Sequence, residues 1–193
     1  MSEKDIIQKH QNIIKRLDLK DSLLSELEQT VDQRIDRYFE IDHQGIVGNH
    51  YFARASSECI KLYRDGYYIS AVMVSQAVNE GIVKFIAERN GIKEKKTYCD
   101  LLNEFMQKSI ITSECAQSSK EIWGSFRNDV HHMNPKVATI PFQQIAKKNL
   151  QNLAIIEKEI FGADFRNGNL IPHHPKYWDI QKDGTVPAFL RLG

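Results

Sequence analysis

A strongly apolar stretch between Tyr67 and Arg89 is the feature that most constrains the fold. Its apolar residues fall on nearly every face of a helix rather than on one stripe, so we expect this helix to lie at the centre of the molecule. A second helix is predicted over residues 49–64, and the Asp65–Gly66 pair between the two is typical of a tight turn. Two helices joined in this way form an antiparallel hairpin, which is the core unit of a helical bundle.

Helical periodicity extends over most of the remaining chain. Thr97 and Ser113 precede two of the periodic segments and are their expected N-caps. The fold class that we predict is therefore all-α, an antiparallel helical bundle with a helical N-terminal extension and an irregular C-terminal tail. The additional amphipathic helices are expected over residues 3–17, 22–40, 98–107, 114–126 and 141–160.

The chain divides into three parts. Residues 1–45 form an N-terminal helical extension that we expect to pack on the bundle, and they carry seven basic and ten acidic side chains, a net charge of −3. Residues 46–162 form the bundle. Residues 163–193 are richer in proline and glycine, and Tyr177–Ile180 with Thr185–Val186 predict a small hairpin or an extended arm. This tail contains too many apolar groups for a polar linker, so we expect it to dock on the bundle or on a partner subunit.

The composition excludes several classes of protein. Lysine and arginine number 26 against 25 acidic residues, and this balance neither requires nor excludes nucleic acid. Three dispersed cysteines give no disulfide framework or zinc motif and fit a reducing cytoplasm. No stretch approaches ~18 consecutive apolar residues, and the first residues lack the apolar core of a signal peptide. We expect a cytoplasmic protein without a membrane span, a cofactor or a bound metal.

The chemistry of the chain is concentrated between Trp123 and Pro135. Six consecutive residues, Arg127 to His132, supply one arginine, one amide, one carboxylate and two histidines. Histidine exchanges protons near neutral pH, and arginine holds an anion in a planar fork of donors. These groups suit chemistry at a phosphate, which needs an acid, a base and a stabiliser of negative charge. Pro135 prevents a helix from continuing past this segment.

The segment resembles a known family motif. Arg127–Asn128–x–x–x–His132 is similar to the R-x4-6-H motif of the HEPN superfamily, whose members are small helical bundles and often metal-independent ribonucleases. The resemblance implies that His132 is the acid and base, that Arg127 stabilises the phosphorane and that Asn128 orients the histidine or the phosphate. It also implies a homodimer in which two motifs share one cleft, and products with 2′,3′-cyclic phosphate and 5′-hydroxyl ends.

The motif residues need a particular geometry. On a continuous helix Arg127 and His132 would point about 140° apart, so a productive pair requires the helix to end nearby or a second copy to face it. The alternative is that Arg127 pairs with Asp129 on the surface and that both histidines are solvated residues at a helix end. His131 could bind a phosphate or nothing.

Other residues are candidates for supporting the motif. Glu80 interrupts the apolar helix with Ser75, Gln76 and Asn79, and a buried carboxylate there would need a partner such as Arg127. The alternative is a strip of polar side chains that face solvent. A further set consists of lysines that could hold an RNA backbone or simply be solvated: Lys136, Lys147 and Lys148, with Lys93, Lys95 and Lys96 in the charged connector.

These observations lead to one functional hypothesis and two alternatives. The hypothesis is a homodimeric, metal-independent endoribonuclease that acts as a toxin or an antiviral effector, with an antitoxin or a larger defence complex as a possible partner. Asn134 stands where some HEPN toxins carry a tyrosine that is modified by a partner enzyme, which argues against that form of silencing. The alternatives are a catalytically inert HEPN-like module that binds RNA, a nucleotide or a protein, and a purely structural bundle.

Overall fold

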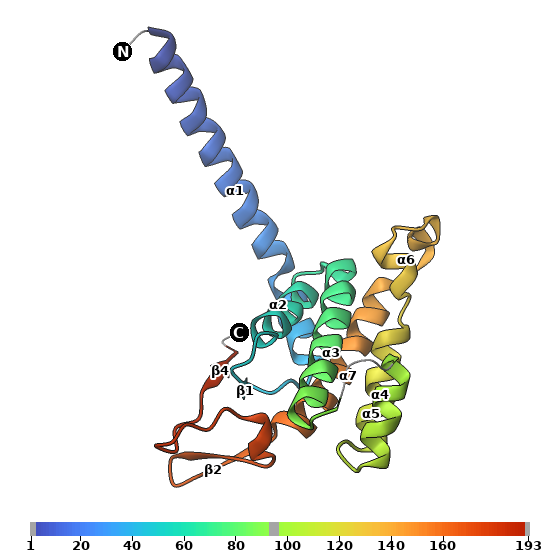
Figure 1. Cartoon of the computed structure of the whole chain (residues 1–193). Helices are drawn as coiled ribbons and strands as arrows, with labels where there is room; N and C mark the ends of the chain where they lie inside the picture. Colours follow the sequence, from blue (N-terminus) through green and yellow to red (C-terminus); the bar gives the residue numbers. More distant parts are fainter. Residues whose placement is uncertain (1–2, 93–96, 192–193) are drawn as a thin grey trace.

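The computed structural model describes residues 3–92 and 97–191, and within them the chain is mostly helical. The connector lysines Lys93, Lys95 and Lys96 lie outside the described residues. The predicted hairpin is present as α2 (Ala53–Arg64) and α3 (Tyr68–Arg89). Gly66 between them has a φ of 87°, which L side chains rarely adopt. The all-α helical bundle is therefore confirmed (Figure 1).

Helix α3 is the centre of the bundle. It packs against α2, against α7 (Phe142–Phe161) and against α5 (Ser113–Gly124). Val72 and Ile82 on α3 are fully buried, as its all-round apolar composition predicts. Among the described residues, α3 is the one helix long and apolar enough to cross a membrane by length and composition. Its position in the core accounts for that composition.

Helices α4 and α5 begin with threonine caps. Helix α4 (Tyr98–Gln107) starts after Thr97, whose hydroxyl accepts a bond from the Asp100 amide as predicted. The predicted cap at Ser113 is wrong, because Thr112 caps α5 by accepting from the Cys115 amide at 3.2 Å. The Thr112 amide also donates to Glu159 on α7 at 2.7 Å, and this bond fixes the helix start one residue earlier. Next come the short helix α6 (Arg127–His131) and a 3-10 turn, η1 (Pro135–Thr139).

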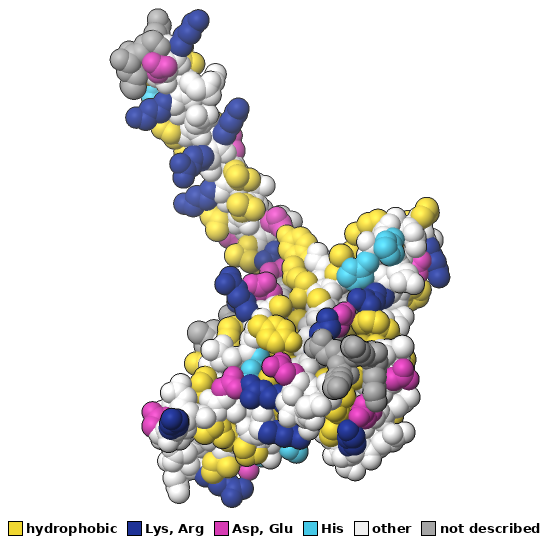
Figure 2. All heavy atoms as spheres, viewed as in Figure 1, with side chains coloured by type: hydrophobic (Ala, Val, Ile, Leu, Met, Phe, Trp, Pro, Cys, Tyr) yellow, Lys and Arg dark blue, Asp and Glu magenta, His cyan; other side chains and the backbone are white. Residues whose placement is uncertain are grey.

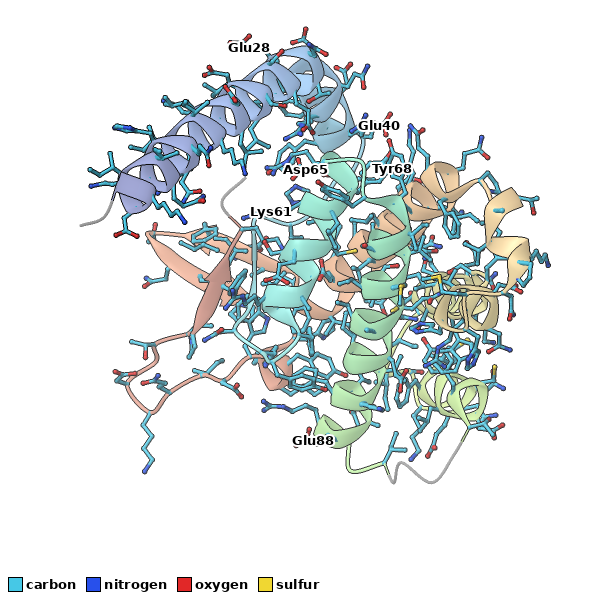
Figure 3. All side chains as sticks on the ribbon, turned by 90° about the horizontal axis from the view of Figure 1, so that it is seen from above. Glu28, Glu40, Lys61, Asp65, Tyr68 and Glu88 are labelled. Atoms are coloured by element: carbon cyan, nitrogen blue, oxygen red, sulfur yellow. The ribbon has the colours of Figure 1, made fainter. Side chains whose placement is uncertain are left out.

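The N-terminal extension differs from the prediction. Instead of two helices that pack on the bundle, it forms one continuous helix, α1 (Glu3–Phe39), that projects away from the bundle (Figure 1). The segment contains no glycine or proline that would interrupt a helix. Only its C-terminal end is attached, since Arg34 lies 3.7 Å from Asp65 and Arg37 donates to the Arg64 carbonyl at 2.9 Å. Figure 3 shows Asp65 and Tyr68 at this end of the bundle and Glu88 at the far end of α3.

The tail docks on the bundle, but not as the predicted hairpin of residues 177–186. Tyr177 and Trp178 are instead only 1% and 2% exposed, so burial rather than strand pairing places them. Tyr177 ends a second 3-10 turn, η2 (Pro175–Tyr177). A hairpin forms earlier, between β2 (Ala163–Arg166) and β3 (Asn169–Pro172).

A second short sheet joins the end of the tail to the start of the bundle. The strand β4 (Ala188–Leu190) pairs antiparallel with β1 (Ile46–Gly48), which lies between the predicted helices 22–40 and 49–64. Beside this sheet the guanidinium of Arg191 lies 2.6 Å from Glu157 on α7, and both side chains are almost fully buried. Docking of the tail on the bundle, expected from its apolar residues, is thus confirmed.

Candidate phosphate site at the break between α5 and α6

The motif lies at a break between two helices. Helix α5 ends at Gly124, not at residue 126 as predicted, and α6 begins at Arg127. Phe126 between them adopts a left-handed backbone with φ of 54°, which a continuous helix cannot contain. The chain leaves α6 after His131, and Asn134 bonds back to Asp129 before Pro135 opens η1. The helix is thus interrupted before Arg127 and ends after His131, but the interruption does not lie between Arg127 and His132, which stand at opposite ends of α6.

Arg127 is held on two sides. Its Nη2 lies 2.9 Å from Oε2 of Glu80 on α3, so the predicted contact between these residues is confirmed. Its guanidinium also lies 3.9 Å from the centre of the Trp123 ring, an arrangement that favours a cation over an aromatic face. Both side chains of the ion pair remain about one third exposed, at 35% and 28%. The expected alternative, a surface pair between Arg127 and Asp129, does not form: Asp129 lies near Lys136 and Asn134 instead.

His131 contacts helix α3 one turn away from Glu80. Its Nε2 lies 3.1 Å from Oε1 of Gln76, while the Gln76 amide nitrogen donates to the Ser125 carbonyl at 2.7 Å. Because that nitrogen is the donor, Oε1 is the acceptor, and His131 must carry its proton on Nε2. Arg127 and His131 are four residues apart on α6, and so are Glu80 and Gln76 on α3. His131 thereby anchors α6 on α3.

His132 and Asn128 face solvent. His132 is the residue that ends α6, and its exposed side chain makes no hydrogen bond or ion pair within the described part of the chain. Asn128 is exposed as well. In Figure 2 histidine side chains are visible on the tip of the molecule where α6 lies. A hollow of about 350 Å³ beside α6 is lined by residues that include Trp123, Arg127 and Asn128.

A buried polar network holds the break in place. Ser75, Gln76 and Asn79 are at most 1% exposed, so the alternative of a solvent-facing polar strip is wrong for these three. The Asn149 amide donates to Ser75 at 3.0 Å and to Ser125 at 2.9 Å. These bonds join α3, α7 and the segment that leads into α6.

Several residues around the site were not predicted from the sequence. Asn149 and Ser125 are single polar residues in ordinary helical and loop contexts. Trp123 lies within the motif window, but its place under Arg127 depends on the break after Gly124. Tyr98 on α4 stacks on Trp123, and the centres of the two rings lie 4.0 Å apart.

The described lysines of the predicted set, Lys136, Lys147 and Lys148, do not form a shared basic face. Of these three lysines, Lys136 is the one at the site, 4.0 Å from Asp129 and 5.3 Å from the centre of the Phe126 ring. On α7, Lys147 pairs with Glu40 at 3.3 Å and Lys148 pairs with Glu121 at 3.2 Å. Hydrogen bonds from Asn152 and Gln117, with Lys148 adding to them, lower the pKa of the Glu121 carboxyl. Within residues 3–92 and 97–191, no group of three or more His, Cys, Asp or Glu could hold a metal ion.

Comparisons with protein-family models, with curated proteins and with solved structures find no match to this chain. The resemblance to the HEPN superfamily therefore depends on the motif and its surroundings. Chemically, the segment offers a fixed guanidinium and an exposed amide beside an open hollow, and an exposed imidazole at the other end of α6. A guanidinium can bind a phosphate and an imidazole can exchange a proton near neutral pH.

Proposed function

We propose that this protein is a metal-independent endoribonuclease of the HEPN type that acts in the cytoplasm as a toxin or an antiviral effector. The observation that supports the proposal best is the division of roles within α6. Arg127 is fixed by Glu80 and Trp123, whereas His132, at the other end of the same short helix, is exposed. Phosphoryl chemistry without a metal requires a fixed cation and a free imidazole, and because these two groups lie at opposite ends of α6, they come together across two copies of the chain.

In the proposed reaction, the 2′-oxygen of a ribose attacks the adjacent phosphorus and the bond from phosphorus to the 5′-oxygen breaks. His132 takes the proton from the 2′-hydroxyl, and the imidazolium of His132 from a second copy protonates the leaving 5′-oxygen. Arg127 neutralises the charge that develops on the phosphorane, and Asn128 orients the phosphate. The products carry a 2′,3′-cyclic phosphate and a 5′-hydroxyl. His131 positions α6 through Gln76 and takes no part in proton transfer.

The exposed position of α6 favours a site shared by two copies. The helix lies at a tip of the bundle (Figure 1), so two tips can approach without obstruction from the core. One chain supplies a single Arg127 and a single His132, whereas two copies provide both a base and an acid. A symmetric contact of this kind is isologous and closes as a dimer.

A second candidate function is a catalytically inert module that binds RNA, a nucleotide or a protein partner. The observation in its favour is that Arg127 already has an anionic partner, Glu80, and that Lys136, Lys147 and Lys148 each lie near a carboxylate. A phosphate must compete with these carboxylates. In this case binding persists but no cleavage follows.

The test is cleavage of end-labelled single-stranded RNA by purified wild type and variants in excess EDTA. His132→Ala should lower the rate by about 10²–10⁴-fold, and Arg127→Ala by about 10²–10³-fold. His131→Ala should have a smaller effect, and His174→Ala, which alters an exposed histidine of the tail, should have none. Product ends are identified by phosphatase and kinase treatment. Equal cleavage by wild type and His132→Ala would mean a contaminating nuclease and would favour the binding module.

A further inference from the structure

Helix α1 carries an apolar stripe that no other described part of the chain covers. At about 100° per residue, six apolar residues fall within about 40° of one another around the helix. They are spaced by seven or four residues, a pattern typical of a helix that pairs with another helix. Their exposed fractions lie between 39% and 54%. We call this set the α1 stripe: Ile6, Ile13, Leu17, Leu24, Val31 and Ile35.

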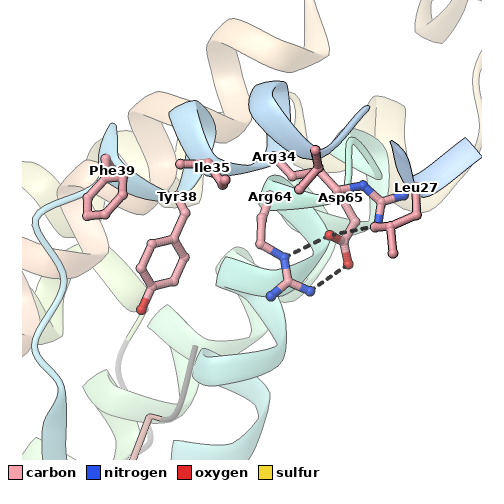
Figure 4. Close-up of a pocket in the computed structure, with 8 residues that line it drawn as sticks. Leu27, Arg34, Ile35, Tyr38, Phe39, Arg64 and Asp65 are labelled. Atoms are coloured by element: carbon pink, nitrogen blue, oxygen red, sulfur yellow. Dashed lines mark hydrogen bonds and ion pairs between the residues drawn. The ribbon is translucent and has the colours of Figure 1, made fainter. Parts of the chain in front are cut away.

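The stripe is continuous with a groove on the bundle. Near the attached end of α1, a groove of about 350 Å³ lies between this helix and the turn that joins α2 to α3 (Figure 4). Val31, Ile35 and Tyr38 contribute apolar lining from α1, and Arg64 and Asp65 contribute the opposite wall. A second helix laid along α1 would therefore cover the stripe and enter this groove.

The charges of α1 are separated along its length. Residues 9–20 contain four basic side chains and one acidic side chain, a net charge of +3. Residues 21–32 contain four acidic side chains and no basic ones, a net charge of −4. Figure 2 shows dark blue side chains concentrated on the free half of the projecting helix. The helix is thus complementary in charge to a reversed copy of itself, whereas a parallel copy would place like charges together.

We propose that α1 pairs with the α1 of a second copy of this chain in antiparallel orientation. The basic half of each helix then lies along the acidic half of the other, and the two stripes face each other. The N-terminal turns of each copy, with Ile6, cover the groove at the other copy's Ile35. The acidic half also disfavours a membrane as the occupant, because surface helices that bind anionic lipid have polar faces rich in lysine and arginine.

This contact is separate from the proposed function. An antiparallel pair places the two bundles at opposite ends of helices about 55 Å long, so the two motifs cannot meet within it. A shared active site therefore requires a second contact at α6. A chain with two isologous contacts assembles into a closed tetramer or an open array.

The first test is the mass of the full-length protein in solution, measured by sedimentation and light scattering. Leu17→Glu with Leu24→Glu places charge within the stripe and should weaken self-association by at least about a hundredfold, halving the number of chains in the particle. Leu19→Glu with Leu23→Glu is the matched control, because these exposed leucines lie on another side of α1 and the charge change is equal. The control should associate within about threefold of wild type. A monomeric wild type, or equal effects of the two pairs, would overturn the proposal.

The second test determines orientation. Ile13→Cys and Val31→Cys are made separately in a Cys99→Ser background, because Cys99 is exposed while Cys59 and Cys115 are buried. In an antiparallel pair with Ile6 at the other copy's Ile35, residue 13 of one copy lies within one helical turn of residue 31 of the other, so a short bismaleimide should join the mixed proteins and neither variant alone. In a parallel pair these positions lie about 27 Å apart, and each variant would instead cross-link to itself. RNA cleavage by the Leu17→Glu, Leu24→Glu protein is measured in parallel. Because the α1 pair does not contain the proposed active site, loss of α1 pairing and loss of cleavage are separate outcomes.

Discussion

Arg127 and Glu80 are 47 positions apart in the chain, yet the guanidinium of one lies 2.9 Å from the carboxylate of the other. The contact joins α6 to the central helix α3 immediately beside the Trp123 ring. Glu80 is also paired with Lys84 at 2.9 Å, so its charge is shared between two cations. The arrangement places a permanent cation at the motif and at the same time gives it a carboxylate with which any phosphate must compete.

Glu80→Gln should strengthen RNA binding several-fold at low salt. The variant removes a negative charge within reach of Arg127 while the stacking on Trp123 remains. Because the ion pair is about one third exposed, the free energy of unfolding should fall by about 1 kcal/mol or less. Glu88→Gln, at the far end of α3 (Figure 3), is the control. Fluorescence anisotropy with labelled RNA measures the effect, and weaker binding by Glu80→Gln would show that Glu80 does not compete with the ligand.

Arg191→Met should destabilise the fold strongly. Arg191 and Glu157 form a buried ion pair at 2.6 Å, with Ser56 bonded to both. Removal of the cation leaves the Glu157 carboxylate buried without its partner, which costs about 3–5 kcal/mol. Urea unfolding followed by circular dichroism measures the loss. Arg166→Met, which breaks an exposed pair with Asp164, should change the unfolding free energy by less than about 1 kcal/mol. Similar losses in both variants would contradict the prediction.

Acidification should loosen the tail through His50. Burial lowers the pKa of His50, although its bond to the Tyr177 carbonyl and the charge of Asp179 oppose the shift. Below about pH 6.5 the unfolded chain therefore binds a proton that the folded chain does not, so stability rises with pH across this interval and is lost as pH falls.

The pH dependence is checked by replacing the histidine. His50→Gln keeps a donor for the Tyr177 carbonyl but cannot titrate. Its melting temperature should therefore change less than that of wild type between about pH 7 and pH 5. His10→Gln, an exposed position on α1, should retain the wild-type slope. An unchanged slope in His50→Gln would assign the dependence to other groups.

Thr112→Ala should cost about 1 kcal/mol of stability, and Ser113→Ala almost nothing. Thr112 accepts a bond from the Cys115 amide at the start of α5, and loss of such a cap typically costs this much. Its hydroxyl also bonds to Glu159 on α7, so the loss should not fall below that value. Thermal or urea unfolding of the two neighbouring variants distinguishes the caps. A larger cost for Ser113→Ala would contradict the assignment of the helix start.

The sequence by itself determined the elements in which local physics and burial agree. The all-round apolar character of α3 placed it at the centre, and the glycine after Asp65 placed the turn before it. The motif residues and the Glu80 contact were also predictable, because a carboxylate in a largely buried helix requires a cation. The apolar side chains of the tail likewise required that it dock.

Tertiary structure decided where several local signals had no unique outcome. The continuity of α1 between the two predicted helices is an exception, since it follows from the local absence of glycine and proline rather than from packing. Tyr177 and Trp178 fit the pattern of a strand. Packing against the bundle, however, buries more of their apolar surface than a solvent-exposed hairpin would. Lys147 and Lys148 of α7 form ion pairs with Glu40 and Glu121 because helix packing places these sequence-distant carboxylates beside them. Contacts between residues remote in sequence depend on how helices pack, and periodicity along one helix does not contain that information.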